Sequence, residues 1–349
     1  MKRLSLIIPM FKVENFVERC LRSLENQDIP RDDYEIICIN DGSPDNCSGI
    51  VRSLQTEFSN IRLLDQENQG VSRARNNGIE HTAGKYVLFI DPDDYVDANS
   101  FAWILKVAED KNAQVTFLGF TVLEEDGTIK HQDFNELAGD RIYTGTEAYY
   151  VSRGDGSTDP DRMWSILFET QFLNTNNLRY LPDVPYLEDG EFVARILCLS
   201  ERCFFSGRSF YQRTTRPGSA TNSRLFHSIP AINGFVKAAI NLRNFRNQVF
   251  LSAPQKEFLN QPILKFVILS ITATASLRRF KTFLAVIFTL KKNGINILEL
   301  NGCHRHYQNL GRLYNLTPFL LYSYLVLRAG VLFICNLRPE GLNRNVAKE

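Results

Sequence analysis

The sequence predicts an α/β fold with a parallel sheet, followed by a basic, mainly helical C-terminal region. Apolar runs of strand length alternate with helix-like segments over residues 1–120, and each run ends in a polar turn. Strands that are apolar throughout are typical of a parallel sheet covered on both faces. The charge is also divided unevenly, because residues 261–349 hold twelve Lys/Arg against three Asp/Glu in a chain of net charge +1.

Length and composition exclude several classes of protein. The 349 residues suggest about two domains, and 44% hydrophobic with 23% charged residues is ordinary globular composition. A disordered, collagen-like or generic nucleic-acid-binding protein is therefore excluded. The seven scattered cysteines contain no CxxC pair and favour a reducing compartment. The basic, apolar start is too short for a secretory signal and is interpreted as a buried strand.

The first 120 residues carry the clearest secondary-structure signals. Strands are expected over residues 4–9, 34–40, 61–65 and 85–91. Helices are expected over residues 15–27, 45–58 and 70–80, with Asp45 as the N-cap of the second. Since ligands of parallel sheets bind at the carboxyl ends of the strands, the loops after Pro9, Asn40, Asp65 and Ile90 are the candidate site.

Weaker signals continue to residue 222, where the first domain is expected to end. Residues 121–160 look like a variable loop region, and a helix is expected near residues 164–174. A helix over 187–200 opens with an acidic cluster, and short strands are expected over 203–206 and 208–212. Residues 223–349 form the helical region. Its segment 317–337 is about 20 residues long and contains Arg328, which favours a buried or surface-lying helix over a membrane span.

Acidic residues crowd the end of the fourth expected strand. Asp91, Asp93 and Asp94 follow it directly, and such carboxylates repel one another unless a cation is present. Mg²⁺ or Mn²⁺, with a substrate diphosphate completing its shell, is the usual solution. The alternative is a solvated acidic turn. Asp41, after the second strand, would lie at the same edge, although an Asp-Gly turn there is common.

A third signal is the segment from Gln69 to Gly78. It places Arg73, Arg75 and a helix N-terminus near the same edge, and both features suit a diphosphate. The alternative is an ordinary amphipathic helix.

Three blocks together resemble a known family. LSLIIPMFKVENFVERCLRSLENQ, YEIICINDGSPDNC and NQGVSRARNNGIEHTAGKYVLFIDPDDYV are similar to the inverting family 2 glycosyltransferases with the A-type fold, in order and spacing. The resemblance implies a Rossmann-like nucleotide-binding sheet, with a nucleotide-sugar half over about 1–120 and an acceptor half over about 121–222. It also implies a nucleotide-sugar donor, most often a UDP-sugar, and a bacterial surface-polysaccharide pathway such as capsule synthesis.

The resemblance also implies roles for individual residues. Pro9 and Phe11 would line the base pocket, with Phe11 stacking on uracil, and Asp41 would hydrogen-bond the base or ribose. Arg75 would support the phosphate region. Asp91 and Asp93 would form the DxD pair, with Asp93 the direct metal ligand. The chain departs from the family at Phe11-Lys12, where Tyr-Asn is usual, so the phenol and amide are lost.

The acidic pair at the start of the helix over 187–200 resembles the family's catalytic carboxylates. Asp189 would be the base that takes the proton from the acceptor hydroxyl, with Glu188 as the second choice. The alternative is an acidic helix N-terminus favoured by the macrodipole. A basic segment further on would place Arg213 or Arg216 over the diphosphate, or would be a solvated loop. The Cys303–His306 cluster lacks a fourth ligand and is interpreted as structural or surface.

Two rival functions remain. Nucleotidyltransferases usually have a Gly-rich loop after the first strand, which is absent here, and an inactive nucleotide-sugar-binding protein would not need all the carboxylates. The basic C-terminal region favours a peripheral position at the inner, cytoplasmic face of the plasma membrane and a saccharide or lipid-linked saccharide acceptor. Homodimerisation through its apolar faces is the alternative. No nucleic-acid partner is expected.

Overall fold

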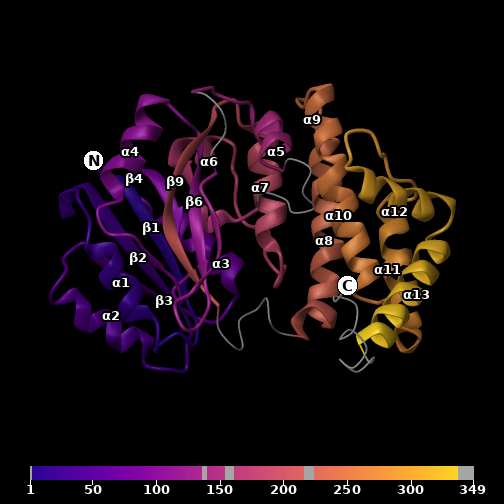
Figure 1. Ribbon diagram of the computed structural model, residues 1–349, viewed down its shortest axis with the longest axis horizontal. Coiled ribbons are helices and arrows are strands. Elements are labelled where there is room, and N and C mark those ends of the chain that lie inside the picture. Colours follow the sequence, from indigo (N-terminus) through magenta and orange to yellow (C-terminus); the bar gives the residue numbers. More distant parts are fainter. Residues whose placement is uncertain (1, 136–139, 154–160, 216–223, 337–349) are drawn as a thin grey trace, which may run out of the picture. The chain divides into compact units, whose positions relative to one another are not determined.

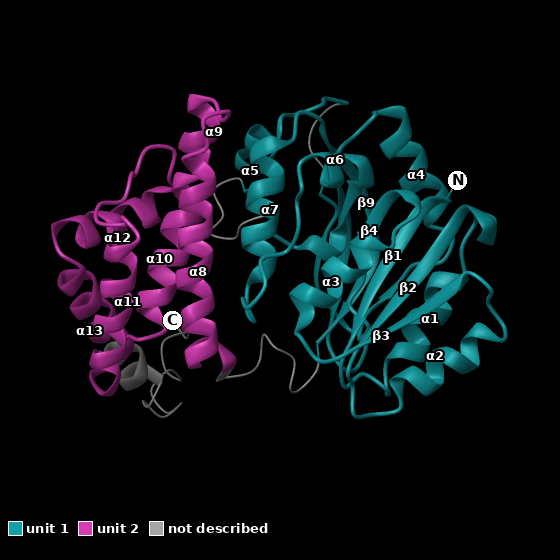
Figure 2. Cartoon of the chain, turned by 180° about the vertical axis from the view of Figure 1, so that it is seen from behind, with its two compact units in different colours: residues 1–223 teal, residues 224–349 magenta. Residues whose placement is uncertain are grey.

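The chain separates into two compact units, residues 1–223 and residues 224–349 (Figure 2). The computed structural model describes residues 2–135, 140–153, 161–215 and 224–336. Within these ranges the first unit combines a sheet with helices, and the second consists of helices. The division falls one residue beyond the boundary expected from the sequence.

The first unit is built on one mixed sheet, which has nine strands within the described residues (Figure 1). Its parallel part has the order β3 (Ile61–Gln66), β2 (Tyr34–Asp41), β1 (Lys2–Met10) and β4 (Gly84–Phe89). Beyond β4 the sheet continues with β8 (Ile166–Glu169), β6 (Val115–Leu123), β9 (Cys203–Thr214) and β5 (Tyr95–Val96), in that order. Strand β7 (Ile129–Asp133) lies off this path and pairs with β6. Because β1, β2 and β4 are parallel, their carboxyl ends meet at one edge of the sheet.

The helices between these strands bury the faces that the sequence predicts. In α1 (Val17–Glu25), the buried residues are Val17, Cys20, Leu21 and Leu24. Helix α2 (Cys47–Gln55) packs beside β3, and α3 (Val71–Glu80) packs against β1 and β2. Gly78 of α3 lies so close to β1 that a Cβ atom there would be 2.4 Å from Ile7 Cγ2. This close packing fixes the height of α3, and therefore of Arg75, above the strand ends.

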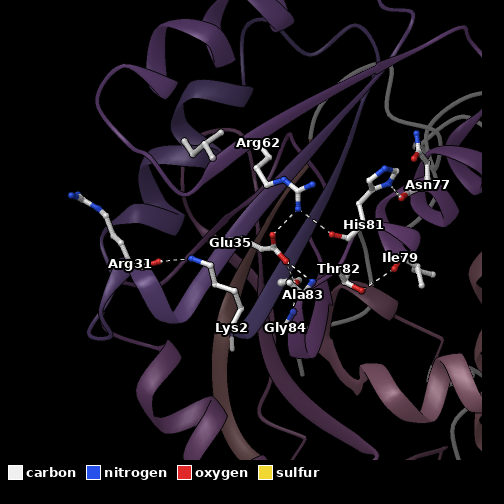
Figure 3. Close-up of polar contacts among 12 residues, drawn as sticks. Lys2, Arg31, Glu35, Arg62, Asn77, Ile79, His81, Thr82, Ala83 and Gly84 are labelled. Atoms are coloured by element: carbon white, nitrogen blue, oxygen red, sulfur yellow. Dashed lines mark hydrogen bonds and ion pairs between the residues drawn. The ribbon is translucent and has the colours of Figure 1, made fainter.

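A buried carboxylate ties the strands together at the opposite edge of the sheet. Glu35 accepts hydrogen bonds from the Ser5 hydroxyl at 2.7 Å, the Ala83 N–H at 2.7 Å and Arg62 Nη1 at 2.9 Å. Figure 3 shows Arg62 lying between this carboxylate and the His81 carbonyl. Because each carboxylate oxygen is satisfied, the buried charge stabilises the amino ends of β1, β2 and β4.

The structure corrects four expectations from the sequence. The described part of residues 121–160 is not mainly loop, because it contains the end of β6, β7 and helix α5 (Gly145–Arg153). The helix expected near 164–174 is a strand, β8, followed by the short α6 (Thr170–Thr175). The two short strands expected over 203–212 are one strand, β9. Helix α2 begins at Cys47 with Asn46 as N-cap, one residue after the expected Asp45, although Asp45 Oδ1 does accept a hydrogen bond from the Cys47 N–H at 3.3 Å.

The helix expected over 187–200 is present as α7 (Glu188–Leu199), with three acidic residues in its first turn. The six cysteines whose side chains the structure describes are buried thiols. Burial raises the pKa of Cys38 and Cys203, which makes these thiols poor nucleophiles.

The second unit contains helices α8 (Ile229–Arg246), α9 (Ala253–Phe258), α10 (Asn260–Thr272), α11 (Phe280–Lys292), α12 (Arg305–Leu316) and α13 (Pro318–Asn336). Ser228 caps α8 by accepting a hydrogen bond from the Ala231 N–H, and the His304 ring accepts one from the His306 N–H at the start of α12. Among the described residues, no single helix has both the length and the apolarity of a membrane span; one pair, Ala253–Thr272 with Leu277–Lys292, passes that test together but is bent by 104°.

Candidate active site

A cavity of about 470 Å³ lies at the carboxyl ends of β1, β2 and β4, where the sequence places the candidate site. The start of α7 and the end of β9 complete its wall. The cavity brings together these residues singled out from the sequence: Pro9, Phe11, Asp41, Arg75, Asp91, Asp93, Glu188, Asp189 and Arg213. Arg216 lies outside the described residues. Segments up to 204 positions apart therefore meet at one concave surface, the default location of a binding site.

Arg75 donates hydrogen bonds to three carboxylates that line the cavity. Its Nη1 donates to Glu188 Oε1 at 2.7 Å and to Asp189 Oδ1 at 2.9 Å, and its Nη2 donates to Asp91 Oδ1 at 3.2 Å. The guanidinium also lies 5.2 Å from the ring centre of Tyr180, and the side chain is only 4% exposed. One buried cation thus links the loop after β4 to the first turn of α7.

Burial raises the pKa of two of these carboxyl groups. The pKa of Asp189 is well above its ordinary value because the group is buried beside Glu188 and Asp91, and the Arg75 guanidinium opposes this rise. The pKa of Asp91 is raised for the same reason, with Asp93 and Glu188 adding repulsion and Arg75 again opposing. Perturbed carboxyl groups that face a cavity mark candidate acid–base sites.

The loop after β4 holds its three carboxylates in different ways. Asp94 is buried: Tyr211 donates its hydroxyl to Asp94 Oδ2 at 2.8 Å, and the Thr214 N–H donates to Oδ1 at 2.7 Å. Burial and the nearby Asp91 and Asp93 raise the pKa of Asp94 to about 8. Asp94 therefore anchors the loop to β9, beside Asp91 and Asp93 in the cavity wall.

The carboxylates of Asp91 and Asp93 indicate which metal ions the cavity suits. Among the described residues there is no cluster of three or more His, Cys, Asp or Glu side chains arranged to hold a metal ion. Asp91 and Asp93 both line the cavity and supply oxygen ligands only. Mg²⁺ and Mn²⁺ are often held by one or two carboxylates together with substrate phosphates. The donor set therefore fits a divalent cation that binds together with a diphosphate.

Asp41 shapes the loop that leads into α3. Its Oδ1 accepts from the Gln69 N–H and from Gln66 Nε2, and its Oδ2 accepts from the Gly70 N–H, each at 2.8 Å. Gly70 has φ +86°, a conformation that L side chains rarely adopt, so glycine suits this turn. A carboxylate accepts about four hydrogen bonds. Asp41, which lines the cavity, thus retains about one acceptor position.

Phe11 and Lys12 lie in the loop after β1, which is held by hydrogen bonds to the loop after β2. Phe11 lines the cavity and is 43% exposed, and Lys12 has φ +58°, a strained backbone for a non-glycine residue. The Lys12 N–H donates to the Ser43 hydroxyl at 2.7 Å, and that hydroxyl donates to Asp45 Oδ1 at 2.6 Å. The Glu14 N–H donates to the other Asp45 oxygen at 2.8 Å. Asp45 therefore clamps the loop after β1 to the loop after β2.

Asp45→Asn should lower the free energy of unfolding by about 1–2 kcal/mol at pH 7. Burial alone would raise the pKa of Asp45, but hydrogen bonds from Ser43 and from the Glu14 N–H lower it to about 2. A depressed pKa stabilises the folded protein above the ordinary value near 4, and that stability is lost as the pH falls toward 2. In urea unfolding, the difference from wild type should be full at pH 7 and shrink below pH 4. A difference that stays constant from pH 7 to pH 2.5 would contradict this account.

Four aromatic residues of this region were not singled out from the sequence. Trp164 and Tyr186 line the cavity, and the Trp164 ring stacks on Tyr211 with centroids 4.7 Å apart. Tyr180 lies under Arg75. The segment that contains Trp164 was interpreted as a helix, so its sequence did not indicate that Trp164 lies at the site. Tyr211 lies in an expected strand, and the alternation of that strand could have assigned its side chain to a face of the sheet.

Comparison with known proteins identifies the first unit. Residues 5–169 match the family model described as Glycosyl transferase family 2. Over these residues the chain is similar to a family 2 glycosyltransferase domain. The match includes β1 to β4, α3 and the loop with Asp91 and Asp93, and the family 2 domain has the A-type architecture expected from the sequence.

Relatives of the family 2 domain are named glycosyltransferases. The uncharacterized glycosyltransferase EpsJ of Bacillus subtilis is 30% identical over 218 residues, which is 62% of this chain and 62% of EpsJ. The GalNAc(5)-diNAcBac-PP-undecaprenol beta-1,3-glucosyltransferase of Campylobacter jejuni is 30% identical over 134 residues, 38% of this chain and 42% of that protein. The chain thus matches less than two thirds of the length of either relative.

A solved structure shares the fold over almost the whole chain. S. aureus TarS 1–349 in complex with UDP-GlcNAc superposes with a TM-score of 0.66 at 16% identity, covering 94% of this chain and 92% of that one. At this identity the similarity establishes the fold of the chain.

Proposed function

We propose that this protein is an inverting glycosyltransferase that moves a sugar from a UDP-sugar to a saccharide or lipid-linked saccharide in surface polysaccharide synthesis. One observation carries the proposal: the Asp91/Asp93 pair and the Glu188/Asp189 pair face the same cavity and are joined by Arg75. Such a transfer needs charge stabilisation at a leaving diphosphate and one carboxylate at the attacking hydroxyl.

The donor would lie over the ends of β1, β2 and β4. Phe11, exposed in the cavity wall, would stack on the uracil beside Pro9, and the remaining acceptor position of Asp41 would contact the base or ribose. Asp93 and Asp91 would hold Mg²⁺ or Mn²⁺ as a DxD pair. When bound, this cation would stabilise the negative charge of the departing diphosphate. Arg213 in the cavity wall would add positive charge near the diphosphate, and Arg216, three residues later in the sequence, is the second candidate for this role.

The acceptor would approach from the side of α7. Asp189 would take the proton from its hydroxyl as that oxygen attacks the anomeric carbon on the face opposite the diphosphate, which inverts the configuration in one displacement. Arg75 would hold Asp189 and Glu188 in place rather than contact the phosphates, since its Nη1 and Nη2 both donate to carboxylates. Burial raises the pKa of Asp189 well above its ordinary value, which makes the deprotonated group a stronger base than an ordinary carboxylate.

The names of relatives support the choice of substrates. The TarS structure contains UDP-GlcNAc, and the Campylobacter relative is named for an undecaprenol-linked acceptor. A lipid-linked acceptor would place the enzyme in the cytoplasm at the inner face of the plasma membrane. The catalytic domain would be residues 1–222, with residues 223–349 as a helical extension.

Calorimetric titration of UDP, with and without Mn²⁺, into wild type and Asp93→Ala tests the donor site. Wild type should bind UDP more tightly with Mn²⁺, and Asp93→Ala should lose this metal-dependent gain because a ligand oxygen is removed. Asp97→Ala is the matched control, since Asp97 lies outside the cavity and accepts a hydrogen bond from Gln212. It should bind UDP as wild type does.

The outcomes separate the rival functions. If folded wild type binds no UDP, the uridine assignment fails, and GDP and dTDP are the next donors to titrate. UDP binding without hydrolysis of any UDP-sugar or transfer to any acceptor would support an inactive nucleotide-sugar-binding protein. Hydrolysis of one UDP-sugar, lost in Asp93→Ala and kept in Asp97→Ala, supports the transferase.

A further inference from the structure

Helix α11 has an apolar stripe that faces solvent. Leu277, just before the helix, is 81% exposed, and Phe280, Leu284 and Phe288 follow on the same face with spacings of three, four and four residues. Phe288 is 69% exposed. The opposite face of α11, which includes Phe283, Val286, Ile287 and Leu290, is buried. An ordinary amphipathic helix has apolar residues only on the face toward the core, whereas α11 also has an apolar stripe on its exposed face.

Helix α13 has a matching stripe. Leu320, Tyr324 and Leu327 lie on one exposed face of α13, with spacings of four and three residues. Leu327 is 70% exposed. Isolated exposed apolar residues are normal on a protein surface, but a stripe continued over successive helical turns indicates an interaction surface.

The two stripes belong to one packed pair of helices. The rings of Phe283 and Tyr322 stack with centroids 4.2 Å apart, and Phe280 lies 6.3 Å from Phe319. Phe280 and Phe319 are themselves exposed, so the contact at the N-terminal ends of α11 and α13 joins the stripes. The combined apolar surface is called the α11/α13 face below.

Basic residues predominate in the part of the chain that contains the α11/α13 face. Residues 277–329 contain eight Lys/Arg and a single acidic residue, Glu299, which is paired with Arg246. Lys281 lies beside the start of the α11 stripe, and Lys291 and Lys292 follow its end; all three are exposed. Arg328 is exposed next to Leu327. An apolar surface bordered by basic side chains matches the chemistry of an anionic bilayer, which offers acyl chains below negative headgroups.

We propose that the α11/α13 face binds the surface of an anionic lipid bilayer, an interaction that goes beyond the sugar transfer proposed for the first unit. The aromatic and leucine side chains enter the interface, and the basic side chains contact the headgroups. Charge complementarity decides between this partner and a second copy of the chain. A symmetric dimer through this face would bring like charges together, whereas anionic lipid neutralises them.

Co-sedimentation of the full chain with vesicles tests the proposal. Wild type should bind vesicles of phosphatidylglycerol and phosphatidylcholine at 0.1 M NaCl, and bind pure phosphatidylcholine at least tenfold more weakly. Leu284→Ser/Phe288→Ser should weaken binding to the mixed vesicles at least tenfold by removing apolar insertion. Lys291→Glu/Lys292→Glu should do the same by reversing two charges. Both pairs are exposed, so circular dichroism and thermal unfolding should match wild type.

Two control variants make the same kinds of substitution outside the α11/α13 face. Val249→Ser/Phe250→Ser removes exposed apolar side chains from the loop before α9, and Lys106→Glu/Lys130→Glu reverses two exposed charges in the first unit. Both should bind vesicles as wild type does. Failure of folded wild type to bind the mixed vesicles, or equal losses in test and control variants, would overturn the proposal. So would a lipid-free dimer that Leu284→Ser/Phe288→Ser converts to monomer, because a second copy would then cover the face.

Discussion

Arg75→Met should lower the free energy of unfolding of the first unit by about 3 kcal/mol at pH 8. Removing one partner of a buried ion pair costs about 3–5 kcal/mol, because the remaining charges stay buried without compensation. The side chain of Arg75 is 4% exposed, whereas those of Glu188, Asp189 and Asp91 are 12%, 23% and 31% exposed. Partial hydration of the stranded carboxylates places the loss at the lower end of that range.

The loss should depend on pH in a definite direction. Burial and mutual repulsion raise the pKa of Asp91 and Asp189, and Arg75 opposes both shifts. Without Arg75 these groups take up protons at a higher pH still, and protonation removes their repulsion. Urea unfolding should therefore show the largest difference from wild type at pH 8 and a smaller one at pH 5.

Two arginine variants serve as controls for Arg75→Met. Arg195→Met removes another buried guanidinium, which pairs with Glu191 at 2.7 Å outside the cavity. It should destabilise the protein to a similar extent without changing UDP binding. Arg73→Met changes an exposed residue of the same helix, 3.9 Å from Asp183, and should cost less than about 1 kcal/mol. An Arg75→Met loss as small as that of Arg73→Met would mean that the carboxylates are not held by a buried charge.

The parallel half of the sheet could be predicted because its signal is local. Strands β1, β2 and β4 are continuous apolar runs that end in polar turns, and burial of these residues is nearly complete. Their carboxyl ends necessarily meet, so Asp41 and Asp91 could be placed at one edge before any coordinates were known. The position of the candidate site follows from this topology alone.

The mixed half of the sheet, from β8 to β5, could not be predicted, since the order of its strands is not local. Strand β8 has only four residues, too few to show a period of two, and it is stabilised by lying between β4 and β6. The segment 115–123 is buried throughout as β6, and its neighbours β8 and β9 come from 50 to 90 positions further along the chain. Propensity within a short window contains no information about such partners.

The long-range contacts between the side chains of the site could not be predicted either. The types of residue needed for the chemistry were found at Asp91, Asp93, Glu188 and Asp189. No local pattern indicates that Arg75, which lies 113 positions before Glu188, joins the two pairs. The separate role of Asp94 depends on Tyr211 and Thr214, about 120 positions away. Catalytic residue types can be read from a motif, whereas the side chains that hold them depend on the tertiary fold.

Asp189→Asn should reduce the rate of UDP-sugar hydrolysis or transfer by about 10²–10⁴-fold, the usual contribution of a general base. The amide preserves the shape of the side chain and can still accept the hydrogen bond from Arg75 through its oxygen, but it cannot take a proton from the attacking hydroxyl. UDP binding should stay within about threefold of wild type. Glu188→Gln is the matched variant, because Glu188 precedes Asp189 and accepts from the same Arg75 nitrogen.

The pH profile distinguishes a base from a merely structural carboxylate. A base works only when deprotonated, so the wild-type rate should rise with pH through the pKa of Asp189, which burial beside Glu188 and Asp91 raises above the ordinary range. Asp189→Asn should remove this limb of the profile, and Glu188→Gln should move it to lower pH by removing a neighbouring negative charge. If Glu188→Gln instead abolishes the limb and Asp189→Asn only shifts it, the proton is taken by Glu188. If both variants keep the wild-type profile, the base lies outside the α7 pair, and Arg75 holds these carboxylates for stability alone.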